Sequence, residues 1–374
     1  MKRKILALVS ILLLFITFVH PKIGNAQSMK SYLVGFNNIV NESLISKHGG
    51  NVKEKYKSIP VVSAYLTDQA VQSLANDPNV SYIEEDAQVH SLGQEVPWGV
   101  PHIHADDVNQ LGGTGSGVNI AVMDSGIDYT HQDLNVVGGA TFVNGTLSYI
   151  DEYGHGTFVA GIVSALNNDL GVVGVASEAN LYSIRVLDKY GNGNFSDVIS
   201  GIEWAISNNI DIINMSFGSN IGSKSLKKAI DKAYNEGILM VAAVGNDGYS
   251  KKGNVNYPAK YKYVMGIGAI DQNNIIADFS SNGKEVDLVA PGVLVNSTYI
   301  NGYAILNGTS MAAPYVTGVA SLLMQLNPEL SNIAIEEILN QSAEPLGDTD
   351  LYGNGLINAL NAYQYSQNNV NKFK

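Results

Sequence analysis

From Gly117 onward, short apolar runs alternate with longer stretches of helical periodicity, and this alternation constrains the fold more than any other feature of the chain. Short continuous apolar runs are typical of strands in a parallel sheet that is buried on both faces. We expect such strands at residues 118–123, 181–186, 210–215, 238–244 and 263–269. Helices are expected at residues 157–166, 196–208, 223–235 and 310–326. The pattern predicts an α/β domain over residues 93–374, with a parallel sheet flanked by helices on both faces.

Residues 27–92 have a different pattern of apolar and polar residues from the rest of the chain. Their pattern predicts strands at residues 31–36, 61–66 and 80–83, with helices at 42–48 and 68–76. This order indicates a small α+β, ferredoxin-like domain. At the other end of the chain, residues 364–374 are polar and are expected to fray.

The first 26 residues have the pattern of a secretory signal peptide. Lys2, Arg3 and Lys4 precede an apolar run over residues 5–19, and small residues precede the expected cleavage after Ala26. The alternative is an amino-terminal membrane anchor, but the run is shorter than the roughly 20 residues that a spanning helix needs. We therefore expect a secreted protein without a stable membrane anchor.

Composition excludes several functional classes. The formal net charge is −12, which argues against a nucleic-acid partner and against an anionic membrane surface. Cysteine is absent, so neither disulfides nor a thiolate nucleophile or metal ligand can form.

Three glycine-flanked segments carry one aspartate, one histidine and one serine, in that chain order. They are Asp124 in Met-Asp-Ser-Gly, His155 in Gly-His-Gly-Thr and Ser310 in Gly-Thr-Ser-Met-Ala-Ala-Pro. A serine hydroxyl becomes a good nucleophile when an imidazole takes its proton and a carboxylate orients that imidazole. Each residue alone has an ordinary structural explanation as a post-strand aspartate or a helix cap.

Their expected positions favour a common site. Asp124 directly follows the first predicted strand, and in parallel α/β sheets ligands bind beyond the carboxyl ends of the strands. Ser310 is expected at the start of a buried helix, where free amides and the helix dipole favour a developing anion. Together the three residues predict a serine hydrolase.

With these motifs, residues 94–363 resemble the subtilisin family, and residues 28–92 resemble its inhibitory propeptide. The resemblance implies a serine endopeptidase, made as a precursor, with Asp124, His155 and Ser310 as its triad. Asn246 would then donate to the oxyanion, although its Gly-Asn-Asp context also fits a simple turn. The propeptide would act as an intramolecular inhibitor and be cut after Leu92. We expect the mature enzyme to be a monomer.

The resemblance also implies a groove that binds extended protein and peptide substrates. Its two sides and its pockets would be formed by Gly191, Asn192, Gly193, Phe195, Ser216, Phe217, Gly218, Ala243 and Gly245. Cleavage is expected after apolar residues. Asn256 stands where family members often have glycine, which leaves the depth of the specificity pocket open.

Calcium is the cofactor that the resemblance implies. Gln94, Asp133 and Asn168 would provide side-chain oxygens, and Leu166, Leu170 and Val172 would provide carbonyls. Oxygen ligands of this kind suit a hard cation. The alternative is a plain Asn/Gly turn at the end of a helix.

Two other functions use the same residues. A non-catalytic member of the fold would bind peptides without cutting them, and would not react with a serine-directed reagent. An esterase or acyltransferase would use the triad on other acyl groups, which a comparison of ester and peptide substrates would detect.

Overall fold

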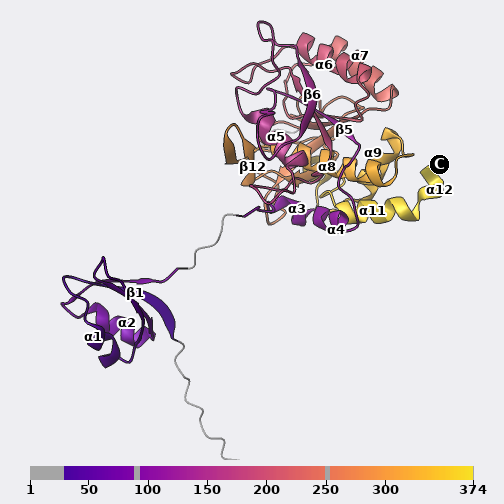
Figure 1. The fold of residues 1–374 in the computed structure, drawn as a ribbon. Helices are drawn as coiled ribbons and strands as arrows, with labels where there is room; N and C mark the ends of the chain where they lie inside the picture. Colours follow the sequence, from indigo (N-terminus) through magenta and orange to yellow (C-terminus); the bar gives the residue numbers. More distant parts are fainter. Residues whose placement is uncertain (1–28, 88–92, 249–252, 374) are drawn as a thin grey trace, which may run out of the picture. The chain divides into compact units, whose positions relative to one another are not determined.

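The computed structural model describes residues 29–87, 93–248 and 253–373. They form two compact units, one before residue 92 and one after it (Figure 1). The expected processing positions Ala26 and Leu92 lie outside the described residues, as does the expected signal peptide.

The first unit is a four-stranded antiparallel sheet with two helices. Its elements are β1 (Lys30–Phe36), α1 (Glu42–Lys47), β2 (Asn51–Lys55), β3 (Val61–Leu66), α2 (Asp68–Ala75) and β4 (Val80–Glu85). The strand order β2-β3-β1-β4 is the ferredoxin-like arrangement. A small core of its own, which includes Val34, Ile45, Val62 and Leu74, holds the helices to the sheet.

The second unit contains a seven-stranded sheet in which all neighbouring strands are parallel. The strands are β5 (Asn119–Asp124), β6 (Val136–Thr141), β7 (Asn180–Arg185), β8 (Ile212–Met215), β9 (Leu239–Ala243), β10 (Met265–Ile270) and β11 (Leu288–Pro291). Their order is β11-β10-β9-β8-β5-β7-β6. The predicted α/β class is confirmed, and β6 and β11 join the five expected strands.

Helices surround this sheet. They are α3 (Gly99–His102), α4 (Ala105–Gln110), α5 (His155–Ser164), α6 (Phe195–Ser207), α7 (Lys224–Asn235), α8 (Thr309–Leu326), α9 (Asn332–Ser342), α10 (Thr349–Tyr352), α11 (Ala359–Asn368) and α12 (Val370–Phe373). α6 and α7 lie on one side of β5 and β6, and α5 and α8 lie on the other (Figure 1). The expectation of a frayed tail was wrong, because α11 and α12 occupy most of it.

The helix α8 forms the centre of the core. Every residue from 311 to 323 is buried, and the helix packs against β8, β9, β10 and β11. A hairpin of β12 (Val295–Tyr299) and β13 (Gly302–Leu306) packs against α5 through β12. Within residues 29–87, 93–248 and 253–373, no helix combines the length and apolar character that crossing a membrane would require.

The carboxyl ends of β5, β8 and β9 position the site. These three strands are neighbours and run in the same direction, so their last residues lie along one edge of the sheet. Asp124 ends β5, Ser216 follows β8, and Asn246 follows shortly after β9. The fold therefore brings residues far apart in the sequence to one crevice.

Candidate active site

Asp124 and His155 are hydrogen-bonded at the carboxyl ends of the central strands. Asp124 is fully buried, and its Oδ1 lies 2.8 Å from Nδ1 of His155, the first residue of α5. Gly154 precedes the histidine with a φ of 100°, and a Cβ there would lie 2.3 Å from the Tyr299 ring, so this helix start requires glycine. Among the described residues, none forms a hydrogen bond with Nε2 of His155.

The surroundings of His155 favour its protonated form. Burial lowers the pKa of the imidazole, but the charge of Asp124, its hydrogen bond and the charge of Asp151 outweigh burial and raise the pKa above its usual value. The contact with Asp124 also fixes the proton of the neutral ring on Nδ1, which leaves the Nε2 lone pair available as a base.

Ser310 is held at the same edge by Ser216. The Ser310 hydroxyl donates to the Ser216 carbonyl at 2.8 Å, and the Ser216 hydroxyl donates to the Ser310 carbonyl at 2.8 Å. Because Ser216 follows β8, the neighbour of β5, these bonds hold the start of α8 one strand away from Asp124. No hydrogen bond joins Ser310 to His155 in the part of the chain that the structure describes.

Asn246 is oriented by Thr309. Its Oδ1 accepts hydrogen bonds from the Thr309 backbone N–H and hydroxyl, both at 3.0 Å. Since the oxygen is engaged, the amide has one possible orientation, and its Nδ2 is directed away from Thr309 as a donor. Asn246 and Ser310 line the same small cavity.

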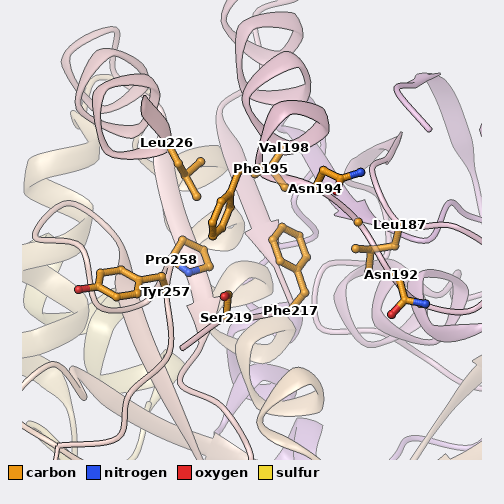
Figure 2. A pocket seen from close by; sticks show the side chains of 13 residues that line it. Leu187, Asn192, Asn194, Phe195, Val198, Phe217, Ser219, Leu226, Tyr257 and Pro258 are labelled. Carbon is orange, nitrogen blue, oxygen red and sulfur yellow. The ribbon is translucent and has the colours of Figure 1, made fainter. Parts of the chain in front are cut away.

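The expected substrate residues line two neighbouring cavities. The first is lined by Gly191, Asn192, Gly193, Phe195, Phe217 and Gly218, among others. Figure 2 shows the Phe195 and Phe217 rings in this cavity, with Leu226 to one side and Leu187 to the other. The second, of about 240 Å³, is lined by Phe217, Gly218, Ala243, Gly245, Asn246, Asn256, Thr309 and Ser310. Ser216 lines neither cavity and is buried beneath Ser310.

Asn256 is one of the residues that line the second cavity. Its Nδ2 donates to Asp247 at 2.7 Å, and the side chain is buried. Gly245 has a φ of 110°, and a Cβ there would lie 2.1 Å from this nitrogen, so the amide lies directly on the glycine backbone. Asn256 therefore contributes a buried polar side chain to the lining of this cavity.

Asp151 is a residue of this site that the sequence analysis missed. Its carboxylate accepts hydrogen bonds from the loop before α5 and from the first turn of that helix. An aspartate a few residues before a helix start is a recognisable capping signal, and it could have drawn attention to this position.

The six residues expected to hold calcium lie together. Nε2 of Gln94 faces four oxygens: the carbonyls of Leu166, Leu170 and Val172, and Oδ1 of Asn168. An amide nitrogen has two protons, so it cannot satisfy four acceptors. Beside them, Oδ1 of Asp133 is buried without a partner among the described residues.

These donors fit a hard cation. Burial raises the pKa of Asp133, although the Val172 amide and the Tyr303 hydroxyl act in the opposite direction, so a nearby positive charge would stabilise its carboxylate. No cluster of three His, Asp or Glu side chains that could hold a metal ion occurs in the described ranges. A cation here would therefore be bound mainly by carbonyl and amide oxygens, as Ca²⁺ often is.

Comparison with known proteins agrees with this geometry. The model of the subtilase family matches residues 115–355. Subtilisin E of Bacillus subtilis (strain 168) is 46% identical over 351 residues, which cover 91% of this chain and 92% of that protein. M-protease of Shouchella clausii (strain KSM-K16) is 49% identical over 306 residues, covering 82% and 80%. The thermostable alkaline protease of Halalkalibacterium halodurans is 44% identical over 364 residues, covering 96% and 99%.

Proposed function

Since the chain belongs to the subtilase family and is a serine endopeptidase, we propose that Asp124, His155 and Ser310 are its catalytic triad. The observation that carries the proposal is the 2.8 Å hydrogen bond between Asp124 and His155, at the sheet edge where Ser310 lies in the first turn of α8. Subtilisin is itself one of the standard examples of this arrangement.

In the first half of the reaction, the Ser310 hydroxyl attacks the carbonyl carbon of the peptide bond. His155 Nε2 takes the hydroxyl proton, and Asp124 stabilises the imidazolium that forms. The carbonyl oxygen becomes an anion and accepts hydrogen bonds from Asn246 Nδ2 and from the backbone N–H of Ser310 in the first turn of α8. His155 then gives its proton to the leaving amine as the C–N bond breaks.

In the second half, water attacks the acyl-enzyme with His155 again as base, which releases the carboxylic acid and returns the proton to Ser310. His155 must be neutral for both steps. Activity therefore falls as the pH drops through the pKa of His155, which Asp124 and Asp151 raise against the opposing effect of burial.

The hydroxyl must first leave the Ser216 carbonyl. Rotation about the Cα–Cβ bond of Ser310 breaks that hydrogen bond and frees Oγ to approach His155. The exchange of one hydrogen bond for another costs little, because a typical intramolecular hydrogen bond contributes only about 1 kcal/mol net.

A serine-directed phosphonylating reagent tests the function. One equivalent should attach to Ser310, identified by peptide mapping, and activity should disappear in proportion to labelling. The unfolded protein is the control and should not react. Label on another residue, or full activity after complete labelling of Ser310, would refute the triad.

We further infer that the enzyme cleaves denatured proteins broadly, after apolar residues of moderate size. Gly191–Gly193 and Ser216–Gly218 offer backbone groups for an extended peptide. The cavity beside Ser310 would receive the side chain before the cleaved bond, and Asn256 limits its length. Mapping the cuts in a denatured protein checks this, and a predominance of cuts after charged residues would contradict it.

Secretion as a precursor completes the proposal. The signal peptide would direct export, and the first unit would inhibit the enzyme until it is cut off after Leu92. Leucine suits the apolar pocket, so the enzyme itself can make this cut. Amino-terminal sequencing of the secreted protein should find a start at or next to Gly93, and a distant start would exclude this junction.

Ca²⁺ is proposed as a structural cofactor. Gln94, Asp133 and Asn168 would hold it with side-chain oxygens, and Leu166, Leu170 and Val172 with carbonyls. The ion would supply positive charge beside a buried carboxylate and take no part in the acyl transfer. The crowded acceptors around Gln94 and the unpaired oxygen of Asp133 support this assignment.

Removal of calcium with a chelator is expected to lower thermal stability. An ion present at about 1,000 times its Kd stabilises the folded state by about 4 kcal/mol, which for a domain of this size corresponds to roughly 10 °C. Calorimetry with and without the chelator measures the effect. Gln94→Ala should abolish the difference, whereas Asp169→Asn, an exposed position in the same loop, should retain it. Equal melting temperatures for the unmodified protein would remove the proposal.

A further inference from the structure

Asp151 accepts five hydrogen bonds although it lies outside the triad. Its Oδ1 accepts from the Ser125 hydroxyl at 2.9 Å and from the backbone N–H groups of Tyr153 and Gly154 at 2.9 and 2.8 Å. Its Oδ2 accepts from the Thr157 N–H and hydroxyl at 2.9 and 2.7 Å. The side chain is buried, and within the described residues no lysine or arginine forms an ion pair with it. A buried charge held only by neutral donors is costly to keep, so its position calls for an explanation.

These bonds connect the chain segment that carries Asp124 to the segment that carries His155. The backbone N–H of Ser125 donates to Asp124 Oδ1 at 2.7 Å, and the Ser125 hydroxyl accepts from the Gly156 N–H at 3.0 Å while it donates to Asp151. The residue after Asp124 is therefore tied to the residue after His155. Asp151 orients the Ser125 hydroxyl that accepts from Gly156, and it also accepts hydrogen bonds from the loop that precedes α5.

We propose that Asp151 is a positioning residue, which sets the place and orientation of the His155 imidazole relative to Asp124 and supplies a second negative charge behind it. The inference rests on the proposed triad. It assigns to Asp151 a role in the reaction that is exerted through His155, without contact with the substrate.

The charge of Asp151 is effective because few other charges face His155. The titratable groups on the elements packed against α5 are Asp124 of β5, Tyr299 of β12 and Tyr315 of α8. The preceding loop adds Tyr149, Asp151, Tyr153 and Glu152, which pairs with Arg185, and the loop after β5 adds Asp128, whose N–H donates to Thr157. Of these groups, Asp124 and Asp151 carry the charges that raise the pKa of His155 against the effect of burial.

Asp151→Asn removes the charge at nearly constant shape. The pKa of His155 should fall by up to about one unit, because the protonated form loses a favourable charge. The first measurement is an NMR titration of His155 in the full-length precursor carrying Ser310→Ala, where maturation cannot interfere. Glu152→Gln is the matched control: it removes the same charge one residue away, where the carboxylate pairs with Arg185, and the pKa should not move.

In the active enzyme, Asp151→Asn should move the acid limb of the kcat profile to lower pH. At the pH optimum, kcat should fall about 10- to 100-fold with KM changed less than about threefold, since small misplacements of catalytic groups have effects of this size. An unchanged His155 pKa together with an unchanged acid limb would overturn the inference.

Ser125→Ala separates position from charge and covers the case in which Asp151→Asn fails to fold. It removes the hydrogen bonds of the Ser125 hydroxyl to Asp151 and Gly156 but leaves the Asp151 carboxylate charged. The value of kcat should therefore fall about tenfold, while the pKa of His155 should not change. Unchanged kcat in Ser125→Ala would overturn the positioning role. Failure of the triad itself has a different signature, which is absence of label on Ser310, and the NMR titration of His155 does not depend on it.

Discussion

Replacement of Ser310 by alanine should nearly abolish peptide hydrolysis and leave the precursor uncut. In the proposed mechanism the hydroxyl is the nucleophile, and the remaining groups cannot form an acyl-enzyme without it. The expected loss in kcat is about 2 × 10⁶-fold, which is the magnitude known for the same change in subtilisin itself. Turnover of a peptide substrate and the mass of the secreted protein measure both effects.

Ser321→Ala is the matched control for this variant. Ser321 lies on the same helix and is buried, and its hydroxyl donates to the Gly318 carbonyl within α8. Loss of that bond should cost about 1 kcal/mol of stability and leave kcat unchanged. If Ser310→Ala retained more than about a tenth of the activity, Ser310 would not be the nucleophile.

Replacement of Asn246 by alanine should lower kcat while KM changes little. Asn246 lines the cavity beside Ser310. In the proposed mechanism, the bond from its Nδ2 to the oxyanion forms in the transition state and is weak or absent in the bound substrate. The expected loss is about 10²–10³-fold, again a figure known from subtilisin itself. Steady-state kinetics at saturating and limiting substrate separate the two parameters.

Two further variants sharpen the test of Asn246. Thr309→Val removes one of the two donors that orient the amide, so its kcat should lie between those of the unmodified enzyme and Asn246→Ala. Asn208→Ala changes an exposed asparagine that precedes β8 at the opposite edge of the sheet, and kcat should not change. A loss seen mainly in KM would show that Asn246 binds the ground state.

The central strands were predictable because burial on both faces makes them continuous apolar runs. β6 and β2 were missed because neither strand is a continuous apolar run. β6 contains Gly138 and Gly139 and lies at an edge of its sheet, and β2 is a polar edge strand of the first unit. The last helices were missed because the buried face of α11 consists of the small residues Ala359, Ala362 and Ser366, which give a weak apolar signal.

The residues that we propose as the triad were recognisable because each stands in a short motif with glycine. Asp151 was not recognisable in the same way, since its partners are mostly backbone N–H groups, which every residue except proline carries. The position of Asn256 in the cavity beside Ser310 could not be predicted from the sequence either. It depends on the direction of the Asn256 side chain, which Asp247 determines through a hydrogen bond in the folded protein.

The burial of α8 has a consequence for the durability of the enzyme. Ser310 is the second residue of a helix whose next thirteen residues are buried, and that helix contacts four strands of the sheet. Local opening events draw on regions with few buried contacts, so they can detach surface loops without displacing this helix. Heat inactivation through displacement of Ser310 therefore requires the cooperative disruption of the whole domain.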